Sequence, residues 1–90
     1  MKSLEKEYRE VIKEILIHQT NLLGKKIAYS KANKIIGLEV DKNGHINLTR
    51  DSFEVLQDFV HEYSKLSALV FKYQLGPILQ RHPDVAISIF

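Results

Sequence analysis

Apolar residues in the first quarter of the chain recur at intervals of three and four, the spacing of one face of an α-helix. This pattern predicts an amphipathic helix over residues 3 to about 24, which Gly24 can end. Ile17 falls off the apolar stripe, and Gln19 falls near its middle. The stripe consists of Leu4, Tyr8, Val11, Ile12, Ile15, Leu22 and Leu23.

Helical spacing continues over residues 26 to 36, which predicts a second, shorter helix that Gly37 can end. The pattern then changes to alternation of apolar and polar residues over 38–40 and 45–48. The residues between these segments, 41–44, read Asp-Lys-Asn-Gly. Asn-Gly between alternating segments is a strong hairpin signal, so we expect a two-stranded hairpin with Gly44 at positive φ.

A third helix is predicted from Thr49 to near residue 75, with Thr49 as its N-cap. Leu48 and Phe53 have the spacing of a hydrophobic staple across its start. Gly76-Pro77 is expected to end or kink this helix, and residues 82–84 to form a break. Residues 85–90 are apolar and branched, which fits a strand, but Pro83 could also begin a helix there.

These elements predict one α+β domain over residues 1–90, predominantly α-helical. We expect two long antiparallel helices with a short connecting helix and a small β-hairpin. The chain has no cysteine, which excludes disulfides and thiolate ligands, and its formal net charge is +2. Since no apolar run approaches the roughly 20 residues of a membrane span, we expect a cytoplasmic protein with no membrane partner.

Two short motifs suggest metal binding but lack a required ligand. Residues 39–50 resemble an EF-hand calcium loop, with Gly44 at the sixth position, yet Arg50 stands where an acidic ligand is needed. His61 begins a zincin-like motif in which Lys65 replaces the second histidine. We therefore assign no catalytic residue, no cofactor and no metal ligand from the sequence, and we place His61 on a solvated helix face.

A basic segment after the first helix is the best sign of nucleic-acid binding, because clustered cations bind phosphates and Tyr29 within it could stack on a base. The competing interpretation is a solvated helix face, which the nearly neutral chain favours. The lysines are Lys25, Lys26, Lys31 and Lys34.

The strongest functional expectation comes from surplus hydrophobicity, because the third helix becomes apolar nearly all round over residues 66–71. Either residues 85–90 fold back to cover it or a second copy of the chain does, and we favour the second copy. The predicted self-association residues are Leu66, Leu69, Val70 and Phe71.

This reasoning predicts a non-enzymatic interaction or regulatory module that forms a homodimer. It could serve as an accessory domain of a prokaryotic sensor or regulator, and it could also bind another protein. The alternative is a weak nucleic-acid-binding protein that uses the lysine-rich segment. A small enzyme with an unrecognised site is the third possibility.

Overall fold

The computed structural model describes residues 4–64 and 68–85. As predicted, it is a mostly helical α+β structure with a long N-terminal helix, further helices and a two-stranded antiparallel hairpin. The elements in chain order are α1 (Leu4–Leu23), α2 (Lys25–Ala32), β1 (Leu38–Val40), β2 (Ile46–Leu48), α3 (Ser52–Ser64) and α4 (Ala68–Arg81).

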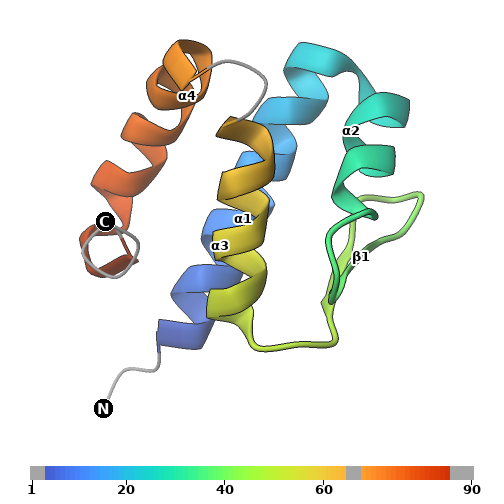
Figure 1. Ribbon diagram of the computed structural model, residues 1–90, viewed down its shortest axis with the longest axis horizontal. Helices are drawn as coiled ribbons and strands as arrows, with labels where there is room; N and C mark the ends of the chain where they lie inside the picture. Colours follow the sequence, from blue (N-terminus) through green and yellow to red (C-terminus); the bar gives the residue numbers. More distant parts are fainter. Residues whose placement is uncertain (1–3, 65–67, 86–90) are drawn as a thin grey trace.

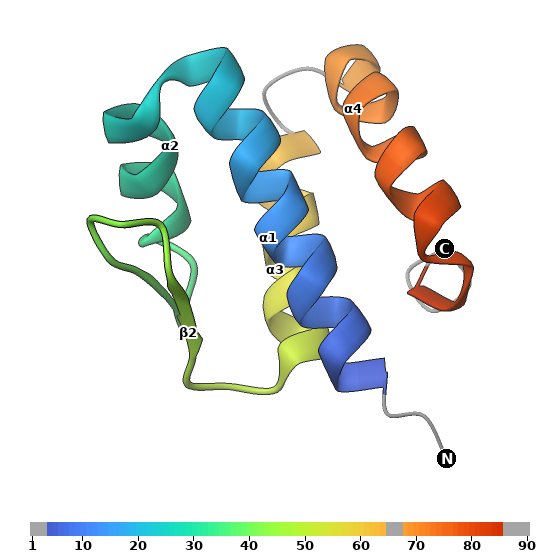
Figure 2. The ribbon, with the colours of Figure 1, turned by 180° about the vertical axis from the view of Figure 1, so that it is seen from behind.

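Helix α1 is the centre of the arrangement, since it contacts α2, α3 and α4. Figures 1 and 2 show α4 along one side of α1 and α3, with α2 and the hairpin along the other side. Helices α1 and α3 begin at the same end of the molecule, while α2 and α4 run back toward it (Figure 1). The prediction of two long antiparallel helices is therefore wrong, because α2 and the hairpin return the chain to the start of α1 before α3 begins.

The predicted long third helix is two helices in the structure. Helix α3 ends at Ser64, and α4 begins at Ala68 and runs back beside α3. The apolar pattern is nearly continuous across these residues, so it gave no sign of the division. Two short helices can set buried faces against both α1 and each other, which one straight helix cannot do.

Gly76-Pro77 was expected either to end or to kink the helix, and the structure excludes the first outcome because α4 continues past this pair to Arg81. A residue before proline is normally disfavoured in helical conformation, because its Cβ meets the proline Cδ. Gly76 has no Cβ, so the helix can pass through this pair. Leu75 and Ile78, on either side of the pair, are 4% and 1% exposed, and their burial stabilises the continued helix.

The start of α3 differs by a few residues from the prediction of Thr49 as N-cap. The structure places Ser52 as the first helical residue. The Asp51 carboxylate accepts a hydrogen bond from the Glu54 backbone N–H at 3.2 Å, so Asp51 fills the capping role. The Thr49 N–H donates to the carbonyl oxygen of Gly37 at 2.8 Å. This bond joins the residue after β2 to the residue before β1.

The hairpin forms where the sequence predicts it, with Glu39 of β1 opposite Asn47 of β2. Its loop closes through the Gly44 N–H, which donates to the Asp41 carbonyl oxygen at 3.0 Å. Gly44 has φ +85°, which confirms the predicted positive φ. Two strands alone are marginal in water, so the hairpin depends on the helix beside it.

Asn33, which directly follows α2, provides much of that attachment. Its Nδ2 donates to the carbonyl oxygens of Tyr29 at 3.0 Å and Val40 at 3.1 Å. Its Oδ1 accepts from the Val40 N–H at 2.8 Å. One side-chain amide therefore joins the end of α2 to the edge of β1.

The core lies between α1, α2, α3, the hairpin and α4, with Phe59, Ile12 and Leu56 fully buried in it. Gln19, near the middle of the apolar stripe of α1, is buried too, at 4% exposed. Within the described part of the chain, no helix is long and apolar enough to cross a membrane.

Among the side chains whose exposure the structure describes, four large apolar ones are at least half exposed: Ile17, Leu22, Ile27 and Ile36. The exposure of Ile17 agrees with its place off the apolar stripe of α1. Leu22 was expected on that stripe, but it is 56% exposed because α1 ends at Leu23, beyond the core. Ile36 was expected in the second helix, yet α2 ends at Ala32 and Ile36 is 75% exposed.

Candidate functional site

The residues predicted for self-association fall on or beside the start of α4. Leu66 lies outside the described residues. Leu69, Val70 and Phe71 belong to the first turns of α4, and their side-chain surroundings lie outside what the structure describes. Helix α4 itself stands at the flank of the molecule, with α1 and α3 on one side of it and no described element on the other (Figures 1 and 2).

The predicted nucleic-acid contacts do not share one face of α2. Lys25, Lys26 and Lys31 are spread around this helix at roughly 100° per residue, and Lys34 follows its end. The Lys25 ammonium lies 5.6 Å from the centroid of the Tyr29 ring, a cation–π contact. Tyr29 is partly buried and packs against the core, so its ring is not a free stacking platform.

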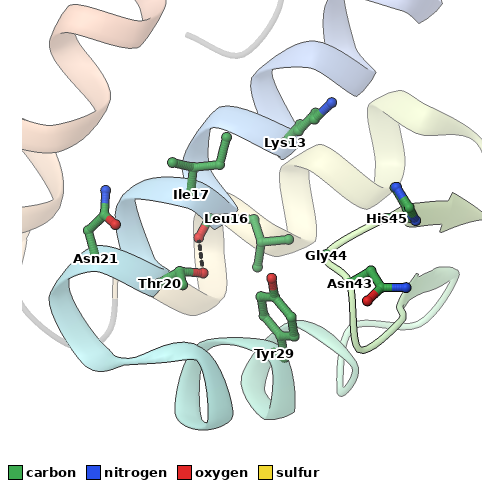
Figure 3. Close-up of a pocket in the computed structure, with 9 residues that line it drawn as sticks. All are labelled: Lys13, Leu16, Ile17, Thr20, Asn21, Tyr29, Asn43, Gly44 and His45. Atoms are coloured by element: carbon green, nitrogen blue, oxygen red, sulfur yellow. Dashed lines mark hydrogen bonds between the residues drawn. The ribbon is translucent and has the colours of Figure 1, made fainter.

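A pocket of about 300 Å³ opens between α1, Tyr29 of α2 and the hairpin loop (Figure 3). Figure 3 shows Tyr29 reaching from α2 toward α1, between Leu16 and the loop at Gly44. The lining residues are Lys13, Leu16, Ile17, Thr20, Asn21, Tyr29, Asn43, Gly44 and His45.

The pocket is lined by both apolar and polar side chains, and its polar groups do not form a reactive arrangement. The Thr20 hydroxyl donates to the Leu16 carbonyl oxygen at 2.7 Å, so it already serves the helix. The His45 ring lies 3.3 Å from the Asp41 carboxylate, which is part of the hairpin turn. The volume is at the lower end of the roughly 300–1,000 Å³ typical of ligand pockets.

The hairpin turn accounts for the carboxylate of the calcium-like loop. Asp41 Oδ1 accepts the backbone N–H groups of Asn43 at 2.8 Å and His45 at 2.9 Å. Arg50, at the position where calcium needs an acid, extends to the Asp58 carboxylate at 2.5 Å. These contacts fit a structural turn followed by a helix start.

A cluster that the sequence analysis missed joins α1 to the end of α4. His82, directly after α4, has a side chain only 10% exposed. Its Nδ1 lies 2.5 Å from Glu7 Oε2, and its Nε2 lies 3.0 Å from Glu14 Oε2. Arg81 adds hydrogen bonds to Glu14 Oε1, from Nη2 at 2.9 Å and from Nε at 3.2 Å.

Two opposing effects act on the pKa of His82. Burial of the ring disfavours its charged form, but the hydrogen bonds and charges of Glu7 and Glu14 favour it more strongly. The net effect raises the pKa of His82 above its usual value. An imidazolium with a carboxylate at each nitrogen is the arrangement that this geometry favours.

No local sequence pattern connects His82 to this cluster, because Glu7 and His82 are 75 residues apart in the chain. The available signal was the helical spacing of Glu7, Glu10 and Glu14, which puts three carboxylates on neighbouring positions of α1. His61 is exposed, as the sequence predicted.

The chain matches no known family model, no curated protein and no solved structure. A functional assignment therefore depends on the chemistry of the residues themselves.

Proposed function

We propose that this domain is a non-enzymatic interaction module that forms a homodimer through the first half of α4. The observation that supports the proposal most is the position of α4. It stands at the flank of the fold, and its sequence is apolar nearly all round at Leu69, Val70 and Phe71. A helix with apolar residues on several sides is stable in water when more than one side is covered.

Helical geometry distinguishes the two sides of α4. Leu75 and Ile78 are buried against the domain's own core. Position 69 is nine residues before Ile78, which is about 180° around a helix at roughly 100° per residue. On an ideal helix, position 69 therefore falls on the opposite side from Ile78. An isologous dimer would place this position against the same position of a second copy.

Concentration-dependent mass measurement tests the proposal. We expect sedimentation equilibrium at about 10–300 µM to show a mass approaching twice 10.4 kDa. Leu69→Asp should lower the mass to that of the monomer, because a carboxylate in an apolar interface loses its hydration without a partner. Circular dichroism must show that the variant keeps its helix content.

His61→Asp is the matched control, because it adds the same charge on α3 at an exposed position. It should leave the dimer intact. A monomer mass for the unmodified chain at the highest concentration would refute the proposal. So would a Leu69→Asp variant that remains dimeric, or a His61→Asp variant that dissociates.

A further inference from the structure

We propose that Glu7, Glu10 and His82 form a binding site for a divalent transition-metal ion, for which Zn²⁺ is the probe. One ligand atom from each of these residues lies within 4.8 Å of the others. Glu7 and Glu10 are three residues apart on α1 and so lie on one side of that helix. The end of α4 lies beside the first turns of α1 (Figure 2), and His82, directly after α4, contacts Glu7 there through Nδ1.

The surroundings of His82 match what a metal-binding histidine needs. Such a histidine usually donates its second ring N–H to a carboxylate, which fixes the ring and its tautomer. Glu14 Oε2 lies 3.0 Å from Nε2, and Arg81 holds the other oxygen of Glu14 at 2.9 Å. Nδ1, on the opposite edge of the ring, faces Glu7 and is the nitrogen left for the metal.

The ligand types set the class of ion. One imidazole and two carboxylates suit zinc and similar borderline ions better than magnesium or calcium, which prefer oxygen ligands alone. Once His82 has released its proton to the solvent, the carboxylates of Glu7, Glu10 and Glu14 outnumber the Arg81 guanidinium beside them, so a divalent cation offsets local negative charge. Three protein ligands leave the fourth tetrahedral position to water.

Small side-chain movements bring the ligand atoms to binding distance. Tetrahedral zinc with bonds of about 2.0–2.1 Å separates its ligand atoms by roughly 3.3 Å. Nδ1 and Glu7 Oε2 must therefore move apart from their present 2.5 Å, and the Glu10 oxygen, which lies within 4.8 Å of both, must come to the same separation. Glu10 is exposed, so its carboxylate has room for this movement. Binding releases the proton shared between Nδ1 and Glu7, because the metal takes the nitrogen lone pair.

The competing explanation is that His82 only links α4 to α1 through its two ion pairs. Glu10 separates the explanations, because the hydrogen bonds of His82 run to Glu7 and Glu14 and not to Glu10. Glu10→Gln therefore removes a metal ligand and leaves the ion pairs in place. His82→Asn removes both the ligand and the ion pairs.

The experiment is calorimetric titration of the metal-free, full-length chain with Zn²⁺ at pH 7.5, together with thermal unfolding. We expect saturable binding of one ion per chain and a higher Tm with zinc. Glu10→Gln should weaken binding by about tenfold or more without changing the Tm of the metal-free protein. His82→Asn should abolish binding, whereas His18→Asn, a change at an exposed histidine of α1, should leave it unchanged.

Two results would overturn the site. One is the absence of saturable binding up to about 100 µM zinc. The other is a Glu10→Gln variant that binds as tightly as the unmodified chain while its metal-free Tm is unchanged. The Glu10→Gln comparison decides the matter even if His82→Asn fails to fold.

Discussion

Replacing Gly44 with alanine should destabilise the domain more than the turn conformation alone explains. Gly44 has φ +85°, and a residue with a Cβ in this region costs about 1–2 kcal/mol. An added Cβ would also lie 2.5 Å from the hydroxyl oxygen of Tyr29 and 3.5 Å from its Cζ. Ordinary contact is nearer 3.5–4.0 Å, so the tyrosine or the loop must shift.

The steric contribution is expected to be about 1 kcal/mol, since a small overpacking change at a partly buried ring costs at least that much. The total for Gly44→Ala is then about 2–3 kcal/mol. With a urea m-value of about 1–1.5 kcal/mol/M, the midpoint of unfolding should fall by roughly 2 M.

A double-mutant cycle separates the two contributions. Tyr29→Phe removes the oxygen that the new Cβ would meet, and it should be nearly neutral alone because this hydroxyl lines an open pocket. In the Tyr29→Phe background, Gly44→Ala should cost only the backbone contribution of about 1–2 kcal/mol. If Gly44→Ala costs the same in both backgrounds, the contact with Tyr29 contributes nothing and this reasoning is wrong.

Two further predictions concern the attachments of the hairpin. Asn33→Asp keeps the acceptor for the Val40 N–H, but it replaces the donating Nδ2 with an oxygen that faces the carbonyl oxygens of Tyr29 and Val40. The free energy of unfolding, measured by urea denaturation, should therefore fall by about 1–3 kcal/mol. A change within about 0.5 kcal/mol would show that this amide does not hold the hairpin. The His45 backbone N–H, aided by that of Asn43, holds the pKa of the Asp41 carboxyl below its usual 3.8. Because the pKa of Asp41 is lower in the folded than in the unfolded protein, this stabilisation is present above pH 3.8 and is lost as the pH falls further. An NMR titration of Asp41 in the folded protein should therefore have its midpoint below 3.8. A midpoint at or above 3.8 would contradict the prediction.

The parts of the fold that depend on neighbours in sequence could be predicted. The spacing of apolar residues placed α1 within about a residue at each end, and the Asn-Gly pair placed the hairpin with Gly44 at positive φ. Both follow from interactions a few residues long, namely the helical repeat and the turn geometry. The start of α3 was predicted a few residues too early, because Thr49 and Asp51 are both good N-cap residues and the local sequence does not distinguish them.

The tertiary structure alone decided how the helices divide and run. The apolar run near residues 66–71 fits one long helix as well as two. A Gly-Pro pair such as Gly76-Pro77 more often ends a helix than lies within one. In the structure α3 ends at Ser64, and α4 continues to Arg81 with Leu75 and Ile78 in buried contact with the core. Such contacts are non-local, so no window of sequence contains them.

The cluster around His82 depends on the tertiary structure most completely. Glu7 and His82 are 75 residues apart, and in sequence Glu7 is an ordinary polar residue of an amphipathic helix while His82 lies in a predicted break. They become a candidate site because α4 runs back along α1 and ends beside its first turns. The sequence determines which residues can ionise or bind a metal, but the packing of α4 on α1 determines which of them meet. The free energy of that packing comes from buried apolar side chains elsewhere in the fold, so the polar residues themselves give no sign of it.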